Sequence, residues 1–328
     1  MSTIKLISIV IPCYNEEDNV IELYGKIKHI FKTLSHYQYE CIFIDNASKD
    51  KTVSILRQMA LRDSNIKIII NARNFGHIRS PYYGLLQTNG DASILIAADL
   101  QDPPQMIYDF ILAWESGYKI VIGIKEKSEE SKVIFAIRKL YYRFITAIAE
   151  VDLVKNFTGF GLYDRNFLNI LKKIDDPYPY FRGFISDIGF SRKEILYTQP
   201  TRKHGKTKNN FYTLYDTAML GITNYSKLPI RLATIGGFIF SISSLFLSVL
   251  FLILKLIFWN SFSMGIASIL CGLFFFFSVL LFFTGILGEY IGSIHTKIMK
   301  RPLVIEEERV NFEISQNNKN IQAEKTTI

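Results

Sequence analysis

Two long apolar stretches near the C-terminus constrain this chain more than any other feature. Leu228–Phe258 and Ile266–Ile291 each contain an apolar span longer than the ~20 residues that a helix needs to cross ~30 Å of hydrocarbon. A content of 49% hydrophobic and 14% aromatic residues is also high for a purely soluble enzyme. We therefore expect two transmembrane helices, at about 229–258 and 265–291, that form a hairpin.

Basic residues lie on both outer sides of this predicted hairpin. Lys227 and Arg231 stand at its start, and Lys297, Lys300 and Arg301 follow its end, whereas the connection between the two helices is short and uncharged. Because positive residues stay on the cytosolic side, the N-terminal part and both termini are expected in the cytosol. The sequence thus predicts a multi-pass membrane protein.

Net charge and motif content narrow the function further. The formal charge is +8, which together with a membrane anchor indicates an anionic membrane surface or phosphorylated substrates as partners, and not nucleic acid. The three cysteines lack the spacing of a disulfide framework or a zinc site. The chain has no Gly-x-x-x-x-Gly-Lys loop and no Gly-x-Gly-x-x-Gly after its first predicted strand, which disfavours P-loop ATPases and dinucleotide oxidoreductases.

The N-terminal part alternates short β-branched runs with helical patterns. Such alternation is typical of an α/β fold with a mostly parallel, Rossmann-like sheet. We assign residues 1–208 to this domain. The predicted strands are Leu6–Pro12, Glu40–Asp45, Ile66–Asn71, Ser93–Ala98 and Lys119–Gly123.

Polar side chains follow three of these strands. Asn15 and Glu16 come after the first strand, Asp45 closes the second, and Asp99 follows the fourth. Because the carboxyl ends of parallel strands meet at one edge, these groups should converge there and suit a nucleotide with a metal-bound diphosphate. Two prolines stiffen the loop that carries Asp99 and Asp102. The plainer interpretation is that Asp99 is only a solvated turn residue.

The segments between this domain and the hairpin are amphipathic or basic. Residues 131–151 predict a helix that lies on the membrane surface or packs on its own sheet, and 209–227 predict a juxtamembrane interfacial helix. Arg202–Lys208 is a basic segment that could clamp phosphates, cover lipid headgroups or be a solvated loop. Residues 293–328 are expected to form a polar cytosolic tail, disordered after Arg309.

Six motifs carry a family resemblance over about Ile7 to Pro302. The chain resembles the family 2 glycosyltransferases that act on polyprenyl phosphates, including bacterial undecaprenyl-phosphate (bactoprenol) glucosyltransferases and dolichol-phosphate mannose synthase. The motifs are Pro12-Cys-Tyr-Asn-Glu-Glu, Ile44-Asp-Asn-Ala-Ser-Lys-Asp50, Arg73-Asn-Phe-Gly-His77, Ala98-Asp-Leu-Gln-Asp-Pro-Pro104, Thr158-Gly-Phe-Gly-Leu-Tyr-Asp-Arg165, and Gly288-Glu-Tyr-Ile-Gly292 with Arg301-Pro302.

The resemblance implies a GT-A fold and an inverting transfer of a hexose, glucose or a related sugar. The donor would be a nucleotide sugar, UDP-linked by preference, and the acceptor undecaprenyl or another polyprenyl phosphate. It also implies Mg²⁺ or Mn²⁺ as cofactor, a place in the cytoplasmic (inner) membrane, a homo-oligomer such as a tetramer, and a product used to modify cell-envelope glycans.

Matching positions give the implied roles of individual residues. Asp99 and Gln101 would bind the metal, and Asp164, Asp99 and Asp102 would be catalytic, with Asp164 in the region of the family's acid/base residue. The nucleotide-sugar pocket would consist of Pro12, Tyr14, Asn15, Glu16, Asp45, Ser48 and Gly76. Phosphate or acceptor binding would fall to Arg182, Arg202 and Lys208.

Two departures from the family pattern leave alternatives open. Ala97 stands where an acid is common, so one metal contact must come from water, Asp102 or the diphosphate itself. Asn46 and Ala47 replace the usual Asp-Gly, which bears on recognition of the base. The alternatives are an inactive membrane scaffold, a transferase with another lipid acceptor, and a processive synthase, which the missing Gln-x-x-Arg-Trp signature disfavours. Asp164 itself could simply cap the following helix.

Overall fold

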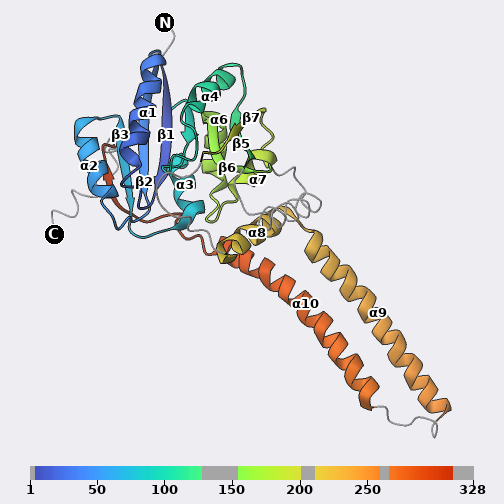
Figure 1. The fold of residues 1–328 in the computed structure, drawn as a ribbon. Helices are drawn as coiled ribbons and strands as arrows, with labels where there is room; N and C mark the ends of the chain where they lie inside the picture. The colour runs from blue at the N-terminus through green and yellow to red at the C-terminus, as the bar shows by residue number, and fades with distance from the viewer. Residues whose placement is uncertain (1–3, 128–153, 201–210, 259–265, 313–328) are drawn as a thin grey trace, which may run out of the picture. The chain divides into compact units, whose positions relative to one another are not determined.

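A computed structural model describes residues 4–127, 154–200, 211–258 and 266–312 (Figure 1). The chain divides into two compact units. The first, here called the sheet unit, comprises residues 1–136, 153–208 and 300–328. The second, the helical unit, comprises residues 137–152 and 209–299. The helix predicted at 131–151 lies outside the described residues.

An eight-stranded sheet with the order β7-β5-β6-β4-β1-β2-β3-β8 forms the sheet unit. β1 pairs in parallel with β2 and β4, β2 with β3, and β5 with β7, while β6 and β8 run antiparallel to their neighbours. This confirms the predicted α/β class with a mostly parallel sheet. The strands are β1 (Lys5–Cys13), β2 (Tyr37–Asp45), β3 (Ile66–Asn71), β4 (Ala92–Leu95), β5 (Ile120–Lys127), β6 (Phe157–Asp164), β7 (Arg192–Thr198) and β8 (Glu306–Val310).

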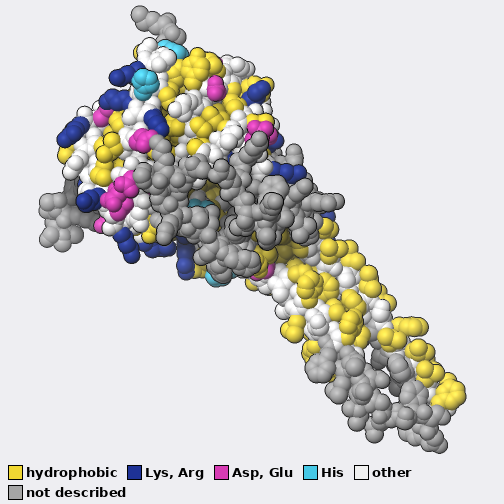
Figure 2. All heavy atoms as spheres, viewed as in Figure 1, with side chains coloured by type: hydrophobic (Ala, Val, Ile, Leu, Met, Phe, Trp, Pro, Cys, Tyr) yellow, Lys and Arg dark blue, Asp and Glu magenta, His cyan; other side chains and the backbone are white. Residues whose placement is uncertain are grey.

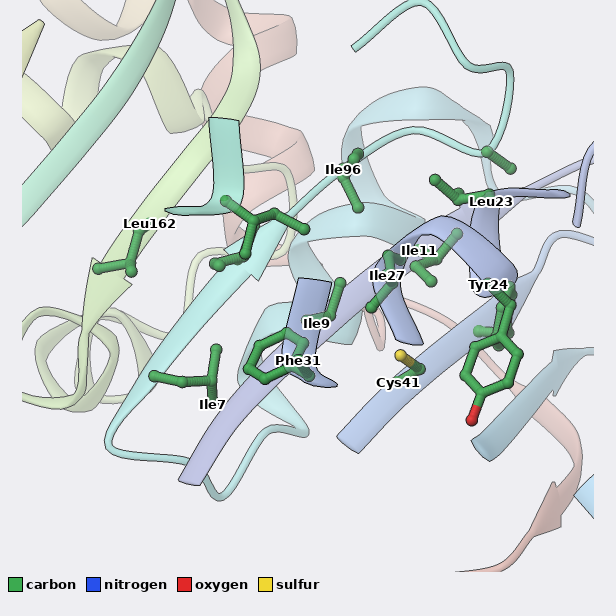
Figure 3. Packing of buried hydrophobic residues seen from close by; sticks show 14 of the residues in the cluster. Ile7, Ile9, Ile11, Leu23, Tyr24, Ile27, Phe31, Cys41, Ile96 and Leu162 are labelled. Atoms are coloured by element: carbon green, nitrogen blue, oxygen red, sulfur yellow. The ribbon is translucent and has the colours of Figure 1, made fainter. Parts of the chain in front are cut away.

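Helices cover both faces of the central strands, and β1 shows why. Its Ile7, Ile9 and Ile11 are fully buried in the core cluster that includes residues of α1 (Figure 3). Val10, which lies between Ile9 and Ile11 in the chain, is buried in the cluster on the opposite face, with residues of α3. The sequence of a strand that is buried on both faces is a nearly continuous apolar run. The helices of this unit are α1 (Val20–Thr33), α2 (Thr52–Arg62), α3 (Gly76–Leu86), α4 (Met106–Glu115), α6 (Arg165–Ile174) and α7 (Phe181–Asp187).

Strand β8 is a structural element that the sequence did not predict. It comes from the segment expected to be a polar tail, and it adds to the sheet beside β3, with Ile68 opposite Val310. Arg57 of α2 forms an ion pair with Glu308, and the Asn311 side chain donates to the carbonyl of Ile66 at 2.9 Å. β8 is a charged run, Glu-Glu-Glu-Arg-Val, and charged residues are typical of an edge strand, which pairs on one side only.

The helical unit contains α8 (Phe211–Tyr225), α9 (Leu228–Ile257) and α10 (Ile266–Ile298). Tyr215 of α8 donates to Glu289 of α10 at 2.8 Å, which gives this acid of the apolar helix a partner. Gly236 lets the Phe283 ring approach α9 closely, since a Cβ at this glycine would lie 2.8 Å from that ring. α8 and α9 therefore each pack on α10 within the chain.

Hydrophobic side chains dominate the visible surface of α9 and α10 (Figure 2). Among the described residues, Phe275–Ile298 is the one segment long and apolar enough to cross a membrane, and Leu228–Ser243 is a shorter apolar segment. One candidate membrane span is thus observed in the C-terminal part, and it is not buried inside the protein.

Candidate active site

Three parallel strands end at the same edge of the sheet, and each is followed by a residue in the left-handed region. These residues are Asn15 after β1 (φ 56°), Ala47 after β2 (φ 62°) and Leu100 after β4 (φ 58°). In a non-glycine residue this conformation is about 1–2 kcal/mol less favourable than the right-handed one. Such strain concentrates where a backbone is held for function. The carboxyl ends of these strands, where the sequence predicts the site, are therefore also where the backbone adopts unfavourable conformations.

Side chains join the loops that follow β1 and β2. The Asn15 backbone N–H donates to Ser48 Oγ at 2.8 Å, and the Lys49 N–H donates to Asn15 Oδ1 at 2.7 Å. Ser48 in turn donates through both its N–H and its hydroxyl to Asp45. Asp45 is fully buried, and burial raises its pKa despite these hydrogen bonds. The structure thus brings Asn15, Asp45 and Ser48 together as one rigid loop pair.

A cavity of about 370 Å³ opens beside these loops. It lies within the size range of ligand sites. Glu16 contributes to its wall, with its backbone N–H held by the Thr52 hydroxyl at 2.9 Å and its carboxylate accepting from the Asn19 amide at 2.6 Å. The full lining is Asn15, Glu16, Glu17, Asp18, Asn19, Lys49 and Asp50. Two of the predicted pocket residues, Asn15 and Glu16, line this cavity.

Asn46, one of the two departures from the family pattern, ties the loop after β2 to the loop after β3. Its side-chain oxygen accepts from the Phe75 N–H at 2.8 Å and from Asn71 at 3.2 Å. Its amide nitrogen donates to Asn74 Oδ1 at 2.9 Å and to the Gly76 carbonyl at 3.2 Å. A carboxylate could not make the last two bonds, because it has no proton to donate. Asn46 therefore places Gly76 next to the predicted pocket.

The loop after β4 holds two acids in different environments. Asp99 is half-buried and accepts from the Gln101 N–H at 3.2 Å. Asp102 is buried, with one oxygen accepting from the Tyr197 hydroxyl at 2.9 Å and the other from the Ala97 N–H at 3.3 Å. Asp102 thus links the loop after β4 to Tyr197 of β7. Asp99, by contrast, lies with Gln101 in the loop that follows β4.

The donor set at this edge suits a hard divalent cation. Among the residues that the structure describes, no three His, Cys, Asp or Glu side chains cluster as a complete metal site. Mg²⁺ and similar cations need only one or two carboxylates when substrate phosphates and water supply the remaining oxygens. Asp99 could provide that carboxylate, with Gln101 beside it, while both oxygens of Asp102 already accept hydrogen bonds. The residues therefore fit a cation that is shared with a diphosphate.

Asp102 should make stability depend on pH in a defined way. Burial raises its pKa to about 6, although Tyr197 and Lys125 lower it. Between about pH 4 and 6 the folded protein therefore keeps a proton on Asp102 that the unfolded chain releases. Because unfolding releases this proton, the free energy of unfolding falls by about 2–3 kcal/mol as the pH rises through this window. We expect thermal unfolding of Asp102→Asn to lack this fall. If the unfolding temperatures of the wild type and Asp102→Asn changed with pH in the same way, Asp102 would not be the group responsible.

Asp164 lies at the end of the sheet opposite to Asp99, away from the other residues of the predicted site. Because β6 is antiparallel to β4, Asp164 pairs with Ala92 at the start of β4, and Ala92 pairs with Ile7 near the start of β1. Asp45 instead pairs with Cys13, six residues further along β1, so about 20 Å separates the two levels. The structure does not bring Asp164 to the other site residues.

At that opposite edge Asp164 has a structural task. It caps α6 by accepting from the Asn166 N–H at 2.9 Å, as the simpler interpretation of the sequence predicted. The Trp114 indole donates to it at 2.8 Å and Lys119 lies 3.1 Å away. Burial would raise the pKa of Asp164, but these donors outweigh burial and lower it. Asp164 is therefore an ionised helix cap.

The remaining predicted residues are placed as follows. Pro12 is the penultimate residue of β1 and Tyr14 begins the loop after it, so both lie at the same edge as Asp45. Arg182 lies in α7, where the adjacent Phe181 packs on the buried Tyr163 with ring centroids 5.1 Å apart. Arg202 and Lys208 lie outside the described residues.

Sequence reasoning missed Tyr197, which faces Asp102 from β7, because no local pattern links two residues so far apart in the chain.

The sequence matches a known family over the part that forms this edge. The family model "Glycosyl transferase family 2" matches residues 8–188. "Uncharacterized glycosyltransferase YkcC" from Bacillus subtilis (strain 168) is 33% identical over 307 residues, 93% of this chain and 94% of the relative. The "SfII prophage-derived bactoprenol glucosyl transferase" of Shigella flexneri is 32% identical over 301 residues, 91% of this chain and 96% of the relative.

A solved structure is similar at greater distance. Mannosyl-3-phosphoglycerate synthase from Rubrobacter xylanophilus shares 16% identity with a TM-score of 0.45, over 71% of this chain and 75% of that one. A likeness this distant carries no inference about the reaction. The family match and the full-length relatives suffice: the chain belongs to glycosyl transferase family 2 and is a glycosyltransferase.

Proposed function

We propose that this protein transfers a hexose, glucose or a related sugar, from a nucleotide sugar to a polyprenyl phosphate such as undecaprenyl phosphate. The observation that carries the proposal is the similarity of nearly the whole chain, including its apolar C-terminal part, to proteins named bactoprenol glucosyl transferases. UDP is the preferred donor nucleotide, and inversion at the anomeric carbon is the expected stereochemistry. The lipid-linked product would serve cell-envelope glycan modification.

The geometry of the sheet edge supports a direct displacement. A phosphate oxygen of the lipid attacks the anomeric carbon of the sugar, the bond from that carbon to the nucleotide diphosphate breaks, and the nucleoside diphosphate leaves. A phosphate monoester is already largely ionised at neutral pH, so no strong general base is required. The chain must instead align two anions and offset their repulsion.

Each part of the edge has a task in this proposal. The loop pair of Asn15, Asp45 and Ser48, with Pro12, Tyr14, Glu16 and Gly76 nearby, would hold the nucleotide. Asp99 and Gln101 would hold Mg²⁺ or Mn²⁺ with the diphosphate, and a cation bound there would neutralise charge on the leaving group. Asp102 would position the Asp99 loop. Arg182, Arg202 and Lys208 would bind the acceptor phosphate.

The helical unit would present the lipid. We propose that α9 crosses the membrane as well as α10, with the catalytic domain and both termini in the cytosol, in the cytoplasmic (inner) membrane. α8, together with residues 131–151, would lie at the membrane surface, and the protein would assemble as a tetramer. The exposed apolar side chains of α9 and α10 support burial of both helices in lipid.

Transfer of labelled sugar tests the reaction. Purified protein in detergent with Mg²⁺ or Mn²⁺ is given a panel of UDP- and GDP-sugars, with and without undecaprenyl phosphate. We expect one donor to give an acid-labile, organic-soluble product that requires the lipid and disappears when EDTA removes the metal. A folded protein that forms no product from any donor would favour an inactive scaffold. Product with a different lipid only would favour another acceptor.

A further inference from the structure

Two arginines of the sheet unit, Arg73 and Arg79, lie over the Phe75 ring, and a third, Arg301, is close enough to Arg79 for its charge to act on it. The guanidinium carbons of Arg73 and Arg79 lie 4.1 and 5.1 Å from the ring centroid. The Arg79 guanidinium also donates to the carbonyl of Pro302, the residue next to Arg301. The loop after β3, the first turn of α3 and the segment after α10 thus each contribute one guanidinium.

This cluster lacks a counter-charge within the described part of the chain. None of the three arginines forms an ion pair with a carboxylate there. Burial lowers the pKa of Arg79, and the charges of Arg73 and Arg301 lower it further. In addition, the buried Nε of Arg79 has no hydrogen-bond acceptor. An anion would supply both the missing charge and the missing acceptor.

The cluster is separate from the diphosphate site proposed at Asp99. It follows β3, which is three strands away from β4 in the order β4-β1-β2-β3. Strands lie ~4.8 Å apart, so the two strand ends are about 14 Å from each other across the sheet. A phosphate bound to Asp99 through a metal would therefore not also satisfy Arg79.

The connection to α10 indicates which anion is nearby. Arg301 follows Ile298, the last residue of the candidate membrane segment, by only three residues. Three extended residues span at most about 11 Å, so Arg301 must lie near that end of the segment. The ends of membrane-spanning segments meet phospholipid headgroups, and anionic headgroups attract basic residues there.

We propose that Arg73, Arg79 and Arg301 form a binding site for the phosphate of an anionic phospholipid headgroup. The planar guanidinium fork matches phosphate oxygens in pairs, which a lysine ammonium does not. Occupied, the site would fix the segment after α10 against α3 through the Arg79–Pro302 contact and hold the sheet unit at the membrane surface.

Calorimetric titration of the full-length protein in detergent tests this site. Short-chain phosphatidylglycerol is added to the wild type and to Arg79→Gln, Arg301→Gln and the double variant, and short-chain phosphatidylcholine serves as the zwitterionic comparison. The matched control is Arg62→Gln, an exposed arginine at the end of α2. We expect binding of phosphatidylglycerol to weaken about tenfold or more in the double variant and to stay unchanged in the control.

Two further measurements separate loss of lipid binding from loss of folding and from loss of charge. Arg301 is exposed, so Arg301→Gln should unfold at the wild-type temperature, and its loss of lipid binding is then not a folding defect. Arg79→Lys keeps the charge but not the fork, and we expect it to restore binding only partly. Wild-type affinity in the double variant would overturn the proposal. Inorganic phosphate that binds as tightly as the lipid would overturn its assignment to a headgroup.

Discussion

Replacing Asp99 with Asn is expected to lower kcat/KM for sugar transfer at least about 100-fold. The substitution keeps the size of the side chain and its acceptor for the Gln101 N–H but removes the negative charge. In the proposed mechanism that charge holds the cation that neutralises the leaving diphosphate. The measurement is the initial rate of lipid-linked sugar formation at limiting donor concentration.

The control for this variant is Asp109→Asn, which removes an exposed carboxylate from α4 of the same unit. It should transfer sugar at the wild-type rate. Both variants should unfold at the wild-type temperature, because neither side chain is part of the apolar core. An Asp99→Asn protein that transfers sugar at more than about one tenth of the wild-type rate would mean that the cation is not held at the end of β4.

Replacing Asp164 with Ala is expected to lower the free energy of unfolding by about 2–4 kcal/mol. The change removes the cap of α6, leaves the buried Trp114 indole without its acceptor, and leaves Lys119 without its partner. Asp164→Asn should be milder, because asparagine still caps a helix. Thermal unfolding in detergent, monitored by circular dichroism, measures both effects.

The functional counterpart separates this account from a catalytic role of Asp164. Below the unfolding temperature, Asp164→Asn should transfer sugar at a rate within about threefold of the wild type, because Asp164 lies at the edge of the sheet opposite Asp99. A stable Asp164→Asn protein that is 100-fold slower would contradict the assignment. It would restore the acid/base role that the family resemblance implied.

The parallel core of the sheet could be predicted from the sequence because its signals are local. The run Leu6–Pro12 lies within one residue of β1 at each end, and Glu40–Asp45 predicted the second half of β2. Both are apolar, β-branched runs that stop at polar residues. The polar groups at their ends share one edge simply because parallel strands point the same way.

The position of Asp164, by contrast, could not be predicted from a local signal. The stretch Phe157–Asp164 ends in an acid, as β2 does, and nothing local in it shows the direction in which the strand enters the sheet. β6 is antiparallel, so its last residue lies at the edge where the parallel strands begin. Strand direction is a property of tertiary pairing, and an acid at a strand end indicates an active site only when that direction is known.

Asn46 and β8 illustrate two other limits of sequence reasoning. From the sequence, Asn46 looked like a weakened base-recognition residue, whereas its four hydrogen bonds hold the loop after β3. The stretch Glu306–Val310 was assigned to a polar tail, because its charged residues form no apolar run. Both become interpretable only when residues distant in the chain, Asn71 and Ile68 among them, are brought next to them by folding.

The most direct test of the central claim compares three proteins in one transfer assay: the wild type, Asp99→Asn and Asp164→Asn, each shown to be folded, with labelled nucleotide sugar and undecaprenyl phosphate. If the end of β4 is the catalytic edge, the wild type and Asp164→Asn form lipid-linked sugar at similar rates and Asp99→Asn forms almost none. Product from Asp99→Asn together with none from Asp164→Asn would place the chemistry elsewhere and contradict the account.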